Sequence, residues 1–159
     1  MKGNNGTGNT TDRDDWETPN KLIYTLDNQY NFTFDCCASI YNHKFKQWSD
    51  NFLEIETTMH PFKIGVCWIN PPFSKAKEMI EHFFKVVKKG VGIYRIDNIE
   101  TQIWFMILNK ADWVHIFNKR INYEGHEGKG ARFGSALFGV GVPPPKNLEG
   151  TTINKLNYR

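Results

Sequence analysis

Four consecutive residues, Asn70-Pro71-Pro72-Phe73, have the chemistry needed to bind a planar amine. The side-chain carbonyl of Asn70 and a prolyl backbone carbonyl can accept the two amine hydrogens, and proline has no N–H to interfere. Phe73 offers a ring face on which a planar base can stack. The residue types therefore predict a site for an amino-substituted ring.

The position of this tetrapeptide in the chain supports the same interpretation. It follows the apolar run 64–69, and two prolines cannot continue a strand's hydrogen-bond ladder. It precedes an amphipathic helix pattern over 74–89. The tetrapeptide is thus expected to be a stiff turn at the carboxyl end of a buried strand, the edge where open α/β sheets bind their ligands.

Alternating strand and helix patterns predict an α/β fold with a mainly parallel sheet covered on both faces. Thr18 is expected to cap a first helix, with Pro19 at its first position. The last two strands have no helix pattern between them, which predicts an antiparallel C-terminal pair. The segment 41–60 has mixed periodicity and is expected to be a reduced or irregular part of the sheet. The expected strands are 31–37, 65–69, 92–96, 113–121 and 134–142, and the expected helices follow Pro19, Pro72 and Ile96.

Several motifs in a fixed order resemble those of a known family. Asp/Asn/Ser-Pro-Pro-aromatic at a strand end resembles the catalytic motif of amino-methyltransferases that use S-adenosylmethionine. The accompanying motifs are Trp16-Glu17-Thr18-Pro19, Phe34-Asp35-Cys36-Cys37-Ala38, Lys119-Arg120-Ile121 and Phe133-Gly134-Ser135-Ala136-Leu137. Their order resembles the short, phage-type, Dam-like DNA N6-adenine methyltransferases, over roughly residues 14–141.

The resemblance implies a compact Rossmann-like methyltransferase fold, S-adenosylmethionine as cofactor and DNA as partner. It implies methyl transfer to the exocyclic N6 amine of adenine, with Asn70, Pro71, Pro72 and Phe73 as the catalytic residues. Two alternatives remain open at this point. The same fold could act on another planar amine, namely a cytosine amine, an RNA adenine or a protein glutamine, or the chain could be an inactive nucleic-acid-binding relative.

An N-terminal group of residues resembles the family's first cofactor element. Trp16, Thr18 and Pro19 precede the first helix pattern, and the amino end of a helix attracts a carboxylate. Simple capping of the helix is the alternative, and the two roles are compatible.

A second group of candidate cofactor residues follows the first strand pattern. Asp35 ends that strand and can accept from the cofactor's ammonium, and the small residues Cys37 and Ala38, with Cys36, allow close approach of the ligand. Asp50 is a further candidate for the adenine or ribose, with an exposed turn as the alternative. The Gly-x-Gly of larger methyltransferases is missing after Asp35.

Candidate DNA contacts are cations near the turn and in a glycine-rich loop. Lys129 and Arg132 can neutralise phosphates, although Glu124 and Glu127 oppose them. Lys75 follows the turn directly and is the third candidate, with a solvated helix face as the alternative.

Composition bounds the remaining properties. The length of 159 residues suits one domain at 14–142, between a disordered tail at 1–13 and an extended tail at 143–159. The net charge of +3 is compatible with a polyanionic partner. No apolar run approaches the roughly 20 residues of a membrane span, and no metal-ligand spacing occurs. Three cysteines, two of them adjacent, suggest a reducing cytoplasm, which is that of a bacterial host if the chain is phage-encoded. The sequence does not give the oligomeric state.

Overall fold

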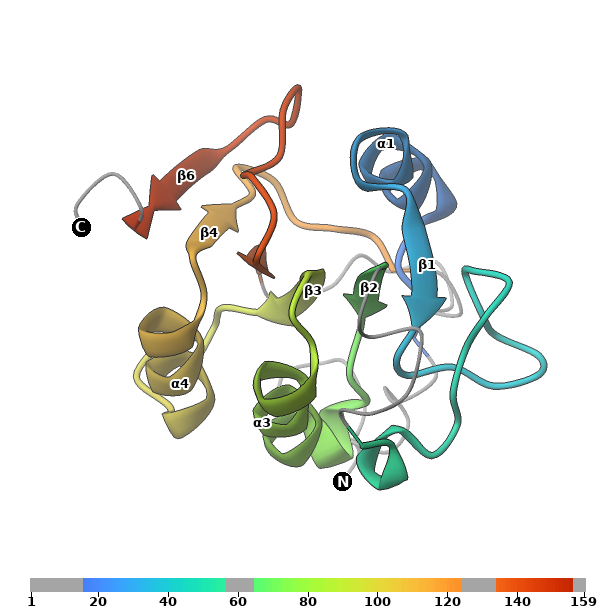
Figure 1. Cartoon of the computed structure of the whole chain (residues 1–159). Coiled ribbons are helices and arrows are strands. Elements are labelled where there is room, and N and C mark those ends of the chain that lie inside the picture. Colours follow the sequence, from blue (N-terminus) through green and yellow to red (C-terminus); the bar gives the residue numbers. More distant parts are fainter. Residues whose placement is uncertain (1–15, 57–64, 124–133, 156–159) are drawn as a thin grey trace, which may run out of the picture.

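The computed structural model describes residues 16–56, 65–123 and 134–155 (Figure 1). Within these ranges, helices and strands alternate through the first two thirds of the chain. In order they are α1 (Asn20–Tyr30), β1 (Phe32–Asp35), the 3-10 turn η2 (Phe52–Glu54), β2 (Val66–Ile69), the 3-10 turn η3 (Phe73–Lys75), α3 (Ala76–Val86), β3 (Gly90–Arg95), α4 (Gln102–Lys110), β4 (Trp113–Ile116), β5 (Ser135–Val140) and β6 (Thr151–Asn154).

All six strands form one sheet in the order β1-β2-β3-β5-β4-β6. The pairs β1–β2 and β2–β3 are parallel, whereas β3–β5, β4–β5 and β4–β6 are antiparallel. Because β5 is antiparallel to both of its neighbours, β4 points in the same direction as β1, β2 and β3. The chain is thus mixed α/β with a six-stranded mixed sheet, which is consistent with a methyltransferase-like fold.

The expectation of a mainly parallel sheet is wrong for the strands that the structure describes. The strands that alternate with helices, β1 to β4, do all point in the same direction. However, β5 lies between β3 and β4 and pairs antiparallel with both of them. The predicted antiparallel pair of the last two strand patterns is present as β4–β5. A further strand, β6, joins the sheet on the outer side of β4.

Two apolar layers enclose the sheet, with α1 on one face and α3 and α4 on the other (Figure 1). Successive side chains of β2 point into opposite layers, because side chains alternate between the two faces of a strand. Cys67 and Ile69 pack with α3 and α4, whereas Trp68 packs with α1. Each face of β2 is thus buried, and the strand's end is held rigidly for the turn that follows.

The helix expected over 74–89 is shorter than its pattern. The turn η3 comes first, so the helix begins at Ala76 rather than after a Ser74 cap, and it ends at Val86. Gly90 does not end the helix; it begins β3. A Cβ at Gly90 would lie 2.6 Å from Cζ of Phe83, so the glycine is required for close packing of β3 against α3.

The first helix also begins later than its sequence signals suggest. Pro19 occupies the N-cap position of α1, and no side chain caps the helix. Thr18 is almost fully buried, with 1% of its surface exposed, and its hydroxyl has no hydrogen-bond partner. The expected capping bond is therefore absent, and the hydroxyl is available for another purpose.

The segment after β1 is irregular, as its mixed periodicity predicts. Asp35 and Trp48 form an isolated parallel bridge, and η2 follows. At the other end of the chain, β6 lies within 143–159, so part of the expected extended tail adds to the sheet. The strand expected over 113–121 ends at Ile116. The tail 1–13 falls outside the described residues, and the division into one domain and two tails stays a prediction.

None of the helices within the described ranges combines the length and the apolar character needed to cross a membrane.

Candidate active site

Strand direction brings three chemically distinct side chains to one edge of the sheet. Asp35 ends β1, Asn70 follows β2 and Arg95 ends β3. These three strands are parallel neighbours, and Asp35 is in register with Trp68 of β2. The carboxyl edge predicted to hold the site is therefore formed by β1, β2 and β3.

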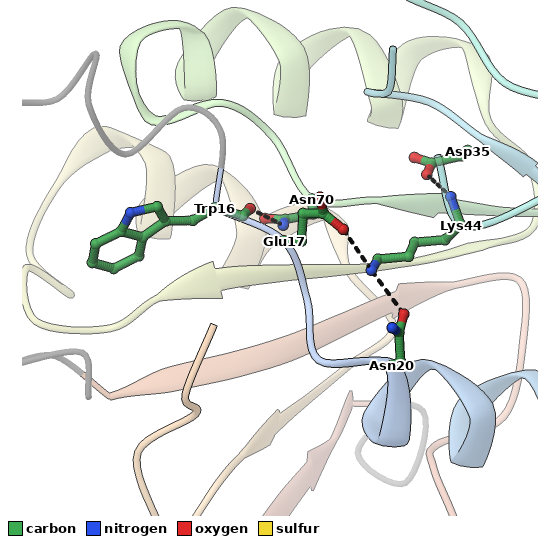
Figure 2. Close-up of polar contacts among 6 residues, drawn as sticks. All are labelled: Trp16, Glu17, Asn20, Asp35, Lys44 and Asn70. Carbon is green, nitrogen blue, oxygen red and sulfur yellow. Dashed lines mark hydrogen bonds and ion pairs between the residues drawn. The ribbon is translucent and has the colours of Figure 1, made fainter. Parts of the chain in front are cut away.

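Asn70 is fixed by a contact with the start of the described chain. Its side-chain nitrogen Nδ2 donates a hydrogen bond to the backbone carbonyl of Trp16 at 3.1 Å (Figure 2). The amide can donate only from nitrogen, so this bond sets which way its carbonyl oxygen Oδ1 points. Asn70 is half-buried, and it lines two pockets, one larger and one smaller, at this edge of the sheet.

The two prolines after Asn70 play different parts. Pro71 is buried, whereas Pro72 is half-buried and lines the larger pocket. The carbonyl of Pro72 accepts a hydrogen bond from the backbone N–H of Lys75 at 3.1 Å, which closes the turn η3. The turn is thus stiff, as its composition predicts, and leads directly into α3.

The larger pocket has a volume of about 230 Å³ and lies between the irregular segment after β1 and the turn that begins at Asn70. One wall comes from the segment after β1 and another from Asn70 and Pro72. Six predicted site residues line it, together with five others: the predicted ones are Cys36, Cys37, Ala38, Asp50, Asn70 and Pro72, and the others are Ser39, Asn42, Ser49, Phe52 and Met79.

A smaller, polar cavity of about 30 Å³ adjoins the larger pocket, and both are lined by Cys37, Asn42 and Asn70. Its remaining walls include two predicted cofactor residues from the N-terminal segment and one from the end of β1. The full lining is Trp16, Glu17, Thr18, Asp35, Cys37, Asn42, Lys44, Trp68 and Asn70. The two cavities therefore lie on either side of a shared wall that includes Asn70.

Asp35 is a buried carboxylate held by backbone groups. Oδ1 accepts from the N–H of Cys37 at 3.3 Å, and Oδ2 accepts from the N–H of Lys44 at 2.9 Å. Burial raises the pKa of Asp35 from 3.8 to about 6, although these two backbone hydrogen bonds and the charge of Lys44 oppose the rise. Asp35 is therefore ionised at neutral pH but close to titration in mildly acidic solution.

The thiols in the larger pocket are neutral. Burial raises the pKa values of Cys36 and Cys37 above the ordinary range of a thiol. A neutral thiol is a small apolar group, so both residues serve as pocket walls rather than as nucleophiles.

Phe73 lies in an aromatic group beside the turn. Its ring meets the edge of Trp16 with centroids 6.2 Å apart, and it packs at a tilt against Tyr94 at 6.3 Å. The guanidinium carbon of Arg95 lies 5.6 Å from the centroid of Phe73. Arg95 is paired with the carboxylate of Asp97, and that pair raises the pKa of Arg95. Cationic and aromatic surfaces thus meet next to Asn70.

The remaining predicted site residues lie outside the two pockets. Pro19 caps α1 beside the smaller cavity, and the side chains of Pro71 and Phe73 line neither pocket. Lys75 is exposed at the end of η3. Lys129 and Arg132 fall outside the described residues.

Sequence reasoning missed several residues of the site. Lys44, Asn42 and Phe52 belong to the segment 41–60, where mixed periodicity gave no strand end from which to place a side chain. Arg95 had a usable signal, because it lies near the end of a predicted strand that neighbours the one ending at Asn70. Among the residues that the structure describes, no group of three or more His, Cys, Asp or Glu side chains is placed to hold a metal ion.

Comparison with known proteins identifies a family whose model matches this sequence. The family model described as DNA N-6-adenine-methyltransferase (Dam) matches residues 6–136, which is most of the chain. A comparison with curated proteins gives no match.

Proposed function

Because the chain belongs to the DNA N-6-adenine-methyltransferase (Dam) family, we propose that it transfers a methyl group from S-adenosylmethionine to the exocyclic N6 amine of adenine in DNA. The observation that carries this proposal is the orientation of Asn70. Its Nδ2 is engaged by the carbonyl of Trp16, so its Oδ1 is the atom that can accept a hydrogen bond from an amine. Asn70 lines both cavities, so a ligand bound in either of them lies beside this residue.

The polar groups around the two cavities fit the cofactor. Asp35 supplies a carboxylate for its ammonium, and the unpartnered hydroxyl of Thr18 is a buried polar group that a bound ligand would satisfy. In the larger pocket, the small side chains of Cys37 and Ala38 leave room for a nucleoside, and Asp50 can accept from ribose or adenine. Trp16 holds the N-terminal segment against this site through its contacts with Asn70 and Phe73, and Pro19 follows at the N-cap position of α1.

The catalytic role of the turn is alignment. When bound, the cofactor supplies a methyl group already activated by the sulfonium. Asn70 Oδ1 and the carbonyl of Pro71 would accept the two hydrogens of the adenine amine, which directs the nitrogen lone pair toward the methyl group. Pro71 and Pro72 keep these acceptors in place, since each ring fixes φ. Alignment and exclusion of water are the main demands of such a transfer.

Access to the amine requires the target base to leave the duplex. Phe73 would provide the stacking surface for the flipped base, with Trp16 and Tyr94 supporting its ring. Lys75, Lys129 and Arg132 are proposed to contact the phosphate backbone.

The experiment that tests this function is incubation with S-adenosylmethionine labelled on its methyl group, with DNA, RNA and protein offered as separate substrates. Digestion of the labelled polymer should release N6-methyladenine from DNA only. If the label is found instead in cytosine, in RNA or in a glutamine side chain, that group is the methyl acceptor and DNA adenine is not. No transfer to any polymer by a protein that binds the cofactor would support an inactive relative instead.

A further inference from the structure

Arg95 lies on the same face of the sheet as Phe73. β3 pairs with β2 as far as Gly92 and then continues to Arg95, beside the turn that follows β2. Because side chains alternate along a strand, Arg95 points to the same face as Ile93, which packs in the apolar layer beneath α1. Phe73 packs against the same layer. The end of β3 thus brings a cation to the aromatic residue of the turn.

The guanidinium of Arg95 is held in one orientation. Its Nε and Nη2 donate to the two carboxylate oxygens of Asp97, and this two-point contact fixes the plane of the group. The backbone carbonyl of Arg95 accepts a hydrogen bond from Nε1 of Trp104 at 2.6 Å, which ties the end of β3 to α4. Both the backbone and the side chain are therefore fixed at this position.

The same guanidinium covers one face of the Phe73 ring. Its carbon Cζ lies over the ring, 5.6 Å from the centroid, which is within the range of a cation–π interaction. Trp16 and Tyr94 contact the ring at angles of 77° and 58° between the ring planes. The cation and the two inclined rings together set the tilt of Phe73. A ring with a cation over one face can accept a base only on the other.

A phosphate contact is the alternative role for an arginine at this edge of the sheet. Two observations favour positioning instead. The carboxylate of Asp97 pairs with the guanidinium and offsets its charge, and only 12% of the side chain of Arg95 is exposed. The group is thus placed to act on the ring beside it rather than on a polyanion outside the protein.

We propose that Arg95, fixed by Asp97, is a positioning residue that sets the angle of the Phe73 ring at which the flipped adenine stacks, an inference that rests on the proposed function. Arginine suits this role because its planar guanidinium can lie on a ring while it holds a carboxylate with two hydrogen bonds. A lysine ammonium can do neither with the same geometry. Arg95 therefore affects methyl transfer through Phe73.

A double-mutant cycle tests whether Arg95 acts through Phe73. Arg95→Met and Phe73→Leu are measured singly and together, with methyl-labelled S-adenosylmethionine and enzymatically amplified double-stranded DNA, which carries no methylated bases. Arg95→Met should lower kcat/KM for DNA by about two- to thirtyfold, the range of a cation–π interaction. In the Phe73→Leu background the same change should cost less than about twofold, because the ring that Arg95 positions is gone.

Two further measurements separate positioning from a phosphate contact. Arg95→Lys keeps the charge but loses the planar two-point contact, so it should lose nearly as much activity as Arg95→Met. The slope of log affinity for DNA against log salt should stay that of the unmodified protein in both variants, because no phosphate contact is removed. Lys88→Met, which removes an exposed lysine just before β3, is the control for loss of one positive charge and should keep full activity.

Asp97→Asn provides a second route should Arg95→Met fail to fold. It leaves the guanidinium in place and weakens the contact that orients it, so kcat/KM should fall by about two- to tenfold. This loss should also disappear in the Phe73→Leu background. Affinity for S-adenosylhomocysteine should change by less than about threefold in every variant, since Arg95 and Asp97 line neither cavity.

The results distinguish the two hypotheses. If the unmodified protein transfers no methyl group to DNA, the proposed function fails and the role of Arg95 falls with it. If transfer occurs but Arg95→Met costs the same with and without the Phe73 ring, or costs nothing, only the positioning role is overturned. Full activity of Arg95→Lys together with a lower salt slope in Arg95→Met would assign the residue to a phosphate.

Discussion

The side-chain nitrogen of Asn70 donates to the backbone carbonyl of Trp16 across 54 positions of the chain, at 3.1 Å. This bond joins the turn after β2 to the segment that precedes α1. Asparagine is the residue type that suits this position. A carboxylate has no hydrogen to donate to the carbonyl of Trp16, and a serine is too short to make that bond while presenting a second acceptor.

The first prediction concerns Asn70. Asn70→Ala removes both the acceptor and the donor, and methyl transfer should fall by at least about a hundredfold, comparable to the loss of one group that stabilises a transition state. Asn70→Asp keeps an acceptor but sets a negative oxygen against the carbonyl of Trp16, so transfer should fall by about tenfold or more. Single-turnover transfer of labelled methyl to DNA measures both effects.

Binding of S-adenosylhomocysteine is the control for these variants. Asn70→Ala should change that affinity by less than about threefold, since its proposed contacts are with the adenine amine. Near-normal transfer by a folded Asn70→Ala variant would contradict the role given to this residue.

A second prediction concerns Asp35. Asp35→Asn preserves the shape of the side chain and removes its charge, so S-adenosylmethionine should bind more weakly by roughly 1–3 kcal/mol. Asn keeps one acceptor oxygen for the backbone N–H groups of Cys37 and Lys44, whereas Ala would leave both without an acceptor. Calorimetry at pH 8 gives the difference, and an unchanged affinity would make Asp35 a purely structural residue.

The third prediction is a pH dependence of cofactor affinity. The pKa of Asp35 is raised to about 6 by burial, and its carboxylate must be ionised to bind an ammonium. Affinity for S-adenosylhomocysteine should therefore rise as pH increases from about 5 to 7 and level off above that range. The same titration of Asp35→Asn should lack this rise.

The stability of the unliganded protein gives an independent check with the opposite sign. Because the folded-state pKa of Asp35 lies above its ordinary value of 3.8, the folded chain holds this proton more tightly than the unfolded chain does. The stabilisation from Asp35 is therefore complete below about pH 4 and is lost as pH rises through about 6. A rise in this contribution over that range would show that Asp35 is not buried as described.

A fourth prediction tests base stacking on Phe73. Phe73→Leu keeps an apolar side chain against Trp16 and Tyr94 but removes the ring, so kcat/KM for DNA should fall by about five- to a hundredfold, the equivalent of roughly 1–3 kcal/mol of stacking. Phe105→Leu is the matched control, because Phe105 is 72% exposed on α4. Equal effects of the two substitutions would exclude a stacking role.

The fifth prediction concerns the cations of the glycine-rich loop. Changing Lys129 and Arg132 together to Ala should weaken binding to DNA of any sequence and lower the slope of log affinity against log salt by about 1–2. The control is the double change of Lys88 and Lys89, which are exposed just before β3 at the opposite edge of the sheet. If the double variant of the loop keeps the salt slope of the unmodified protein, the loop does not contact the phosphates. Lys75 would then be the next candidate to test.

Local sequence pattern was enough to place the Asn-Pro-Pro-Phe turn between β2 and α3. The apolar run before Asn70 and the helical spacing of Met79, Ile80 and Phe83 located β2 and α3, because each pattern reports burial on a single element. The carboxyl edge then followed from the direction of the strands. Asp35, Cys37 and Asn70 meet there as expected.

What the sequence did not reveal depends on long-range contacts. Periodicity within a strand predicts which of its residues are buried, but it does not predict which strands lie next to one another. It therefore could not predict that β5 lies between β3 and β4. Lys44 reaches the site from an irregular segment, so no repeating pattern assigns its direction. The free hydroxyl of Thr18 was unexpected because Thr18-Pro19 is a strong capping signal, and here the helix begins one residue later without using it.

The position of β5 also determines when this molecule can fold during its synthesis. The strand is completed at Val140, near the end of the chain, yet it fills the space between β3 and β4, which are made much earlier. A nascent chain that has not yet emerged past Val140 carries two unpaired strand edges facing each other, and such edges are prone to association with other chains. We therefore expect the sheet to form only after β5 has been synthesised, and loss of β5 to abolish the site even though Asp35 and Asn70 precede it in the chain.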